Sequence, residues 1–425
     1  MKFKHLLLTA SVMALFSSCS NDELVSESTS HGDAIAFSVT TTNATRAADY
    51  WCNNQLPTYF EVSTAYNNAF YFNNEVYKAE GGNYVQADGN YRYWPDVETT
   101  PLYVYAYKVK ADAKDLENKD KLGDEFAQFA WTAANVAPTI TMTPKEEAKD
   151  QHDLLYAYTK VTEKPGYGET ADINFRHALS QIVFYAKCSN SKIQVDIEEV
   201  ALYNAAKSGV FTLPTGDNTT NDEFVDHTQA GTAKTSGLGT WALTPAYEES
   251  ATDKAIRSYK ASCVAKLLAT TENWTNLTDN TNADNKHTNI TQSLLVLPQT
   301  NYGEGKANNN LAAYVPGNGP LKTQGGACIA IKCTIRNIAS GTEATGTDVY
   351  LWGDKQTDGS YKAKDLVIPV AFTWEQGKKY IYRINFAAKG HGGFDPEDGK
   401  EVLVPIQLSV SVDDFAEVTE ITPNF

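Results

Sequence analysis

Cys19, a thiol at the end of a short apolar run, is the first residue of this sequence whose type and position point to a specific reaction. A positively charged start precedes an apolar stretch over residues 6–16, and the letters FSSC close it. Bacterial lipoprotein machinery alkylates a cysteine in this arrangement with diacylglycerol. The stretch is too short to cross the ~30 Å hydrocarbon core of a bilayer. We predict a signal peptide over residues 1–18 and lipidation of Cys19; ordinary cleavage near Ser18 is the alternative.

Enzymatic chemistry finds little support in the rest of the chain. The sequence has no G-x-S-x-G or H-E-x-x-H motif, no P-loop and no dinucleotide-binding glycine pattern. His177 lies in a strand pattern, where a structural histidine is more common than a catalytic one. The loop 390–401 carries three carboxylates between glycines, but not in the EF-hand order. We predict no catalytic residue, no metal site and no cofactor, and treat this loop as a series of turns.

Composition indicates an acidic, β-rich protein. The 425 residues are enough for two or three domains, and their formal net charge is −16. Nucleic acids and anionic membranes bind basic patches, so neither is an expected partner. The chain has 24 tyrosines and 17 phenylalanines against 3 methionines, a bias typical of strands. Its six cysteines show no spacing of a disulfide framework or a zinc site.

The hydrophobic pattern has a period of two almost everywhere after residue 33. Asn-Asn, Gly-Gly and Asp-Gly pairs separate the apolar segments, as turns separate strands. The polar residues 19–33 predict a flexible tether, and the Pro/Gly-rich segment TEKPGYGET predicts a domain boundary. We therefore predict an all-β protein of two consecutive antiparallel β-sandwich domains, over residues 34–165 and 166–425.

The first and last strands of this pattern are amphipathic. Ile35, Phe37 and Val39 share one face of the segment AIAFSVT. The C-terminal strand, predicted over residues 402–412, carries five aliphatic side chains on one face: Val404, Ile406, Leu408, Val410 and Val412. Such a strand can pair within its own sheet or add to an open sheet edge of another molecule.

An ordered set of segments resembles the fimbrillins, the subunits of type V pili in anaerobic Gram-negative bacteria. The set comprises the lipidation motif at Cys19 and the segments TRAADYW, NFRHALSQIVFYAK, IEEVALYNAAKSGVFTL, LLVLPQT, WEQGKKYIYRINF and GHGGFDPEDGKEVLVPIQLSVSVDDF. No single segment is specific, but together they span nearly the whole mature chain in order. The resemblance implies transthyretin-like sandwiches and a lipoprotein precursor held at the outer membrane.

The resemblance also implies an assembly mechanism. A trypsin-like protease cuts the precursor after an arginine, the first strand leaves, and a donor strand from another subunit fills the groove. Arg46 is the candidate cut site, with Ala47 the new N-terminus, because this arginine directly follows the first strand and the chain has only six. Residues 34–46 would then be the removable segment and the C-terminal strand the donor. A solvated loop arginine with no such role is the alternative.

Three functional interpretations follow. The first is a structural pilus subunit on the cell surface, in the shaft or at the tip, whose partners are other subunits. The second is a surface lipoprotein that never polymerises and binds glycans or host proteins through its aromatic residues or its long Asn/Thr-rich loops. The third interpretation is an enzyme, and no nucleophile–base or metal-binding pattern in the sequence supports it. Within the first interpretation, a donated C-terminal strand favours a shaft subunit, whereas a C-terminal strand that stays in the second domain favours a tip or minor subunit.

Overall fold

The computed structural model describes residues 33–39, 58–108, 127–214, 238–244, 257–269, 273–278, 293–300, 327–338, 349–370, 372–390 and 392–414. These residues form β-strands connected by turns and loops, with one turn of 3-10 helix, η3 (Ala148–Asp150). The predicted all-β sandwich fold is confirmed. None of the described residues forms a helix with the length and apolar character to cross a membrane. Cys19, Arg46 and Ala47 lie outside the described residues.

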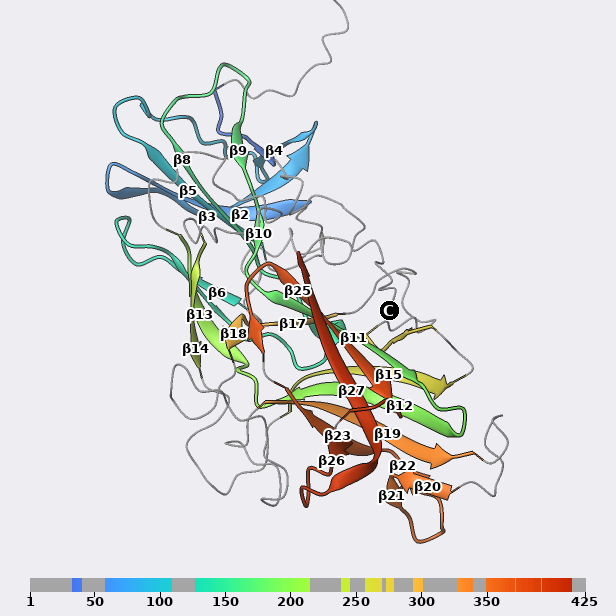
Figure 1. Cartoon of the computed structure of the whole chain (residues 1–425). Helices are drawn as coiled ribbons and strands as arrows, with labels where there is room; N and C mark the ends of the chain where they lie inside the picture. Colours follow the sequence, from blue (N-terminus) through green and yellow to red (C-terminus); the bar gives the residue numbers. More distant parts are fainter. Residues whose placement is uncertain are drawn as a thin grey trace, which may run out of the picture.

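The first sheet has eight strands in the order β10-β8-β5-β2-β3-β4-β1-β9 and lies at one end of the molecule (Figure 1). Its strands are β1 (Phe37–Val39), β2 (Tyr59–Tyr66), β3 (Ala69–Glu80), β4 (Asn83–Gln86), β5 (Leu102–Lys108), β8 (Leu155–Val161), β9 (Ala171–Ile173) and β10 (Arg176–His177). The sheet curls, so that β8 and β9 come into contact. It thereby encloses a hydrophobic cluster, the first core, which includes Phe37, Phe60 and Val104.

Turn residues set the register of the first three hairpin strands. Asn67 and Asn68, between β2 and β3, adopt positive φ angles of 52° and 58°. Gly81 and Gly82, between β3 and β4, adopt 61° and 91°. Two consecutive residues of positive φ match the twist of a tight hairpin, and Asn and Gly tolerate that conformation best. The Asn-Asn and Gly-Gly pairs therefore form the turns that the sequence predicted.

The second sheet has eleven strands, nine of them in the order β15-β12-β19-β23-β26-β27-β25-β11-β16, with β17 paired to β11 and β20 paired to β19. Its strands are β11 (Ser180–Cys188), β12 (Ile193–Tyr203), β15 (Arg257–Leu268), β16 (Thr275–Asn276), β17 (Leu294–Val296), β19 (Cys328–Asn337), β20 (Val349–Trp352), β23 (Lys364–Pro369), β25 (Lys378–Phe386), β26 (Gly392–Phe394) and β27 (Glu401–Asp414). It folds around the second core, which includes Val195, Ile331 and Ile384.

A four-stranded sheet, in the order β14-β13-β7-β6, draws on both halves of the sequence and lies between the two large sheets in Figure 1. Its strands are β6 (Ala127–Ala130), β7 (Thr139–Met142), β13 (Ser208–Thr212) and β14 (Thr240–Thr244). It packs on the outer face of the first sheet through a junction cluster that includes Tyr105, Tyr156 and Phe211. Strand β5 is apolar on both faces for this reason: Val104 enters the first core and Tyr105 the junction cluster.

Two strand pairs depart from the antiparallel pattern. β1 runs parallel to β9, and β11 runs parallel to β25 over eight residue pairs. Two small sheets complete the fold, β18 (Gln299–Thr300) with β24 (Thr373–Trp374) and β21 (Asp354–Lys355) with β22 (Tyr361–Lys362). Although β9 and β10 follow residue 165, both pair with strands of the first sheet. The division of the chain into domains at that residue stays a prediction.

Candidate functional site

The first strand lies inside the first sheet, between β4 and β9. Phe37 pairs with Tyr84 of β4 in antiparallel fashion and with Ala171 of β9 in parallel fashion. The pairing continues before the strand proper, where the Ile35 amide donates to the Arg92 carbonyl at 2.6 Å. The extended segment that is held in place therefore covers residues 33–39, more than the three residues of β1 itself.

The three predicted side chains of this segment all point into the first core. Ile35 and Phe37 are fully buried, and Val39 is half-buried against the same cluster. The Phe37 ring meets Tyr77 edge-on at a centroid distance of 4.9 Å, with Phe60 at 6.4 Å. Since a fully buried aromatic side chain contributes a large hydrophobic term, Phe37 is the main anchor of the segment.

Aromatic side chains from several strands build the wall of the Phe37 site. Phe60 contacts Tyr84 at 4.9 Å and Phe175 at 5.0 Å, while Tyr77 stacks on Phe72 at 6.2 Å. Burial, reinforced by the Glu75 carboxylate, raises the pKa of Tyr77 far above its ordinary value, so this wall is uncharged. The arrangement forms a pocket for one large apolar residue at the centre of the strand.

The opposite face of β1 is polar. The Ser38 hydroxyl donates a short hydrogen bond to Oδ1 of Asp172, the residue directly opposite it on β9. At the start of the segment, Lys164 Nζ lies 3.0 Å from Oδ2 of Asp33. Ala34 and Ala36 share this face with Ser38, so Ser38 is its one polar position within residues 34–39.

The C-terminal strand lies in its own sheet in this structure. β27 covers residues 401–414, slightly more than predicted, and pairs antiparallel with β25 from Ile406 to Asp414. β26 covers its other edge only as far as Pro405. Whether this strand is also donated to another molecule stays a prediction.

Burial along the apolar face of β27 falls steadily toward its C-terminal end. Val404 and Ile406 are buried in the second core, and Leu408 is partly buried against it. Val410 and Val412 are 52% and 53% exposed. The cause is the end of β26: beyond residue 405 no described strand flanks β27 on that side, so its apolar face is left half-covered.

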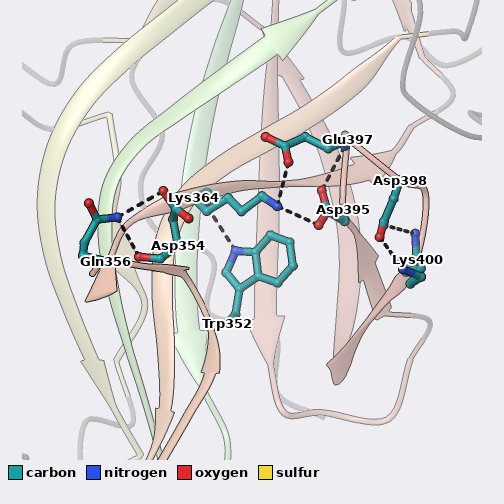
Figure 2. Close-up of polar contacts among 8 residues, drawn as sticks. All are labelled: Trp352, Asp354, Gln356, Lys364, Asp395, Glu397, Asp398 and Lys400. Carbon is teal, nitrogen blue, oxygen red and sulfur yellow. Dashed lines mark hydrogen bonds and ion pairs between the residues drawn. The ribbon is translucent and has the colours of Figure 1, made fainter. Parts of the chain in front are cut away.

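Ion pairs fix the turn that leads from β26 into β27 (Figure 2). Lys364 of β23 places Nζ 2.8 Å from Oδ2 of Asp395 and 3.2 Å from Oε2 of Glu397. Partial burial lowers the pKa of Lys364, but its hydrogen bonds to these carboxylates outweigh that effect and raise it overall. Lys400 pairs with Asp398 at 2.6 Å.

These ion pairs explain the acidic loop in the sequence. Its carboxylates neutralise lysines. Residues 395–400 form the predicted turn, whereas residues 392–394 of the predicted loop form strand β26. Across the described residues, no group of three His, Cys, Asp or Glu side chains is placed to hold a metal ion.

The five arginines other than Arg46 lie in β-strands or form an ion pair. Four of the five lie within β-strands: Arg176, Arg257, Arg336 and Arg383. The fifth, Arg92, follows β4 and donates from Nε to Oε1 of Glu75 at 2.8 Å. Burial lowers the pKa of Arg176 to about 10, while the neighbouring Tyr156 acts in the opposite direction.

The polar contacts at the junction between the two large sheets were not predicted from the sequence. Nδ1 of His177 forms a short hydrogen bond with Oδ2 of Asp153, and both side chains are buried. The Tyr156 hydroxyl accepts hydrogen bonds from the Gly239 amide and the Gln376 side chain. These partners are up to 220 residues apart, so no local pattern could reveal them.

Comparison with known proteins identifies the family of this chain. The family model described as fimbrillin-like matches residues 26–397. A search of curated proteins finds no match. A solved fimbrial protein from Bacteroides vulgatus is similar at 14% identity and a TM-score of 0.48, over 90% of this chain and 99% of that one. The tip fimbrial protein Mfa3 from Porphyromonas gingivalis, with a C-terminal truncation, is similar at 12% identity and a TM-score of 0.29, over 89% and 99% of the two chains. The family model covers most of the sequence, so this chain belongs to the fimbrillin-like family.

Proposed function

We propose that this protein is a structural subunit of a cell-surface pilus that supports adhesion. It reaches the outer membrane as a lipoprotein precursor anchored through Cys19. A trypsin-like protease cuts after Arg46, the first strand leaves, and a strand of another subunit takes its place. The observation that carries the proposal is the position of residues 33–39, a short strand that fills a groove in the first core a few residues before Arg46.

The energetics of the first strand suit a removable plug. Its apolar side chains contribute a gross ~4–7 kcal/mol, at ~1.5–3 kcal/mol for each of the two fully buried side chains and ~1 kcal/mol for the half-buried Val39. Bimolecular association costs an estimated 4–15 kcal/mol, which a strand covalently attached to its domain does not incur. Cutting the chain at Arg46 therefore turns a firmly held strand into one that can dissociate.

The positions of the other five arginines favour selective cleavage at Arg46. A protease binds its substrate in an extended conformation, which a strand paired inside a sheet cannot offer without local unfolding. Four of the other five arginines lie in strands, and the fifth is tied to Glu75. Limited proteolysis of the folded precursor by an arginine-specific protease of the trypsin-like type is therefore expected to begin at Arg46.

The apolar face of β27 supports its role as the donor. Once the first strand has left, the groove exposes unpaired backbone groups and an apolar trough, which together template strand addition. The half-exposed Val410 and Val412 gain burial if they enter such a groove. The main-chain ladder adds hydrogen bonds of a net ~0.5–1.5 kcal/mol each.

Proteolysis of the purified precursor tests the proposal. Treatment with a trypsin-like protease should release the N-terminal segment and produce a ladder of detergent-resistant polymers on a gel. Arg46→Ala should abolish both the cut and the ladder. Arg92→Gln, which removes the other non-strand arginine and keeps a hydrogen-bond donor for the partly buried Glu75, is the matched control and should behave as wild type. Equal polymerisation of the Arg46→Ala protein would contradict the proposal.

A group of exposed aromatic residues favours a second candidate function, the binding of glycans or host proteins by a subunit that does not polymerise. Tyr93 is 57% exposed, and its carbonyl accepts a hydrogen bond from the Tyr71 hydroxyl at 2.7 Å. Tyr71 is 38% exposed beside it, whereas the ring of Phe70, the preceding residue of β3, packs on Trp131 at 4.9 Å. Glycan-array binding by the monomer, lost in Tyr93→Ala and retained when Arg46 is replaced, would favour this function.

A further inference from the structure

The segment Ile406–Val410 of β27 repeats the pattern of the first strand. Residues 35–39 read IAFSV, and residues 406–410 read IQLSV. Three of the five positions are identical, and the central position is a large apolar residue in both. We infer that residues 406–410 of a second copy of this chain occupy the positions of residues 35–39, in the same direction. This inference rests on the proposed function and adds the partner, the register and the orientation.

Backbone pairing alone cannot determine the orientation of an inserted strand here. β1 runs antiparallel to β4 and parallel to β9, so the groove has one edge of each direction. A strand inserted either way round therefore forms one parallel and one antiparallel ladder. Direction and register must be determined by the side chains that enter the groove.

The central pocket selects among the possible registers. The Phe37 site is lined by Tyr77 and Phe60 and accepts a large apolar side chain. With residues 406–410 in the groove, Leu408 enters this pocket. If the inserted strand is shifted by two residues, so that Val410 enters the pocket in place of Leu408, the smaller side chain leaves a larger void among the aromatic residues.

The polar face provides a second criterion. Ser38 donates a hydrogen bond to Asp172, and in the inferred register Ser409 takes this position. A shift by two residues toward the N-terminus brings Gln407 opposite Asp172 and Pro405 to the position of Ala36. Insertion in the reverse direction, with Leu408 still in the central pocket, also brings Gln407 opposite Asp172. Only the inferred arrangement combines Leu408 in the pocket with a serine opposite Asp172.

The same segment covers the part of β27 where its apolar face passes from the second core to solvent. Ile406 is its last fully buried side chain, Leu408 is partly buried and Val410 is half-exposed. On transfer, Ile406 exchanges one core for another, whereas Leu408 and Val410 gain burial. The side chains that gain burial therefore lie within the segment that matches the first strand.

Disulfide trapping between two copies tests the arrangement. Asp172→Cys protein, cleaved after Arg46, is mixed with Ser409→Cys protein and oxidised, and the cross-linked peptide is identified by mass spectrometry. Directly opposed residues on neighbouring strands lie within the Cα separation that a disulfide needs. We expect this pair to cross-link at least about tenfold faster than the control pair, Asp172→Cys with Gln407→Cys. A preference for the Gln407→Cys pair would overturn the inferred orientation.

A second variant tests the pocket. Leu408→Phe restores the side chain that the pocket normally holds, and we expect its polymers to dissociate about tenfold more slowly than those of wild type, a change equivalent to about 1.4 kcal/mol. Val412→Phe, at a half-exposed position outside residues 406–410, is the control and should not slow dissociation. Faster dissociation of the Leu408→Phe polymers would overturn the register.

Peptide binding separates this inference from the proposed function. Cleaved protein is titrated with one peptide of residues 33–42 and one of residues 402–412. Binding of both, in competition with each other, supports the inference. Binding of the first alone overturns the inference and leaves the proposed groove intact. Binding of neither contradicts the proposed function itself.

Discussion

Replacing Phe37 with alanine measures how firmly the first strand holds the first core. The ring is fully buried, and Tyr77 and Phe60 surround it. Truncation of such a side chain to alanine costs about 3–5 kcal/mol, the sum of lost burial and an unfilled cavity. Val39→Ala, at a half-buried position of the same strand, should cost only about 1 kcal/mol. Urea denaturation of the uncut precursor measures both values.

Native-state hydrogen exchange locates the loss. A decrease of about 3 kcal/mol in the stability of the first core should speed the exchange of the β4 amides roughly a hundredfold, because 1.4 kcal/mol corresponds to a factor of ten. Amides of β25, in the second sheet, should change far less. The reasoning would be refuted if Phe37→Ala changed the free energy of unfolding by less than about 1 kcal/mol and left β4 protected. The first strand would then be dispensable before any cleavage.

Three further perturbations address other parts of the fold. Lys364→Met leaves two carboxylates without their cation and should lower stability by about 1–2 kcal/mol in chemical denaturation, whereas Lys400→Met, at a side chain 81% exposed, should change it by less than about 0.5 kcal/mol. Burial raises the pKa of Tyr382 to about 12, so the stability that its neutral side chain contributes is complete below about pH 10 and is lost as the pH rises toward 12. Tyr382→Phe removes this ionisation and should therefore reduce the loss of stability between pH 9 and pH 12 by about 2–3 kcal/mol, which chemical denaturation at the two pH values measures. Asn67→Val places a β-branched residue at a φ of 52° and should destabilise the β2–β3 hairpin by about 1–2 kcal/mol, seen as a lower denaturation midpoint.

Local alternation was enough to predict most of the long strands. The segment YFEVSTAY coincides with β2, and ACIAIKCTIR contains nearly all of β19. Both strands carry a two-residue hydrophobic period that depends only on neighbouring positions. The strand pattern around His177 was predictable, but its division into β9, β10 and β11 was not, because β9 and β10 pair with β1 and β8 of the first sheet. The four-stranded sheet, which combines segments from both halves, has the same non-local origin.

The candidate site was predictable in part for the same reason. The shared face of Ile35, Phe37 and Val39 follows from their spacing, and the structure places all three against the first core. The aromatic wall around Phe37 and the position of Asp172 depend on strands up to about 140 residues away and left no local signal. The loss of burial along β27 likewise follows from where β26 ends. Cys19 and Arg46 lie outside the described residues and stay predictions.

The proposed exchange has a definite source of free energy. A donor strand must leave its own sheet before it enters another molecule, so its burial there is mainly a transfer between two cores. In the inferred register only Leu408 and Val410 gain burial, which amounts to about 3 kcal/mol at most for two partly buried aliphatic side chains. Such a gain cannot displace a first strand that is still covalently attached, because the attached strand acts at a high effective concentration. The cut removes this advantage irreversibly, and the open groove then adds the cost of its unpaired backbone to the drive for insertion. In the proposed mechanism, proteolysis is therefore the step that makes polymerisation favourable, and the burial gained by the donor strand determines how long the polymer lasts.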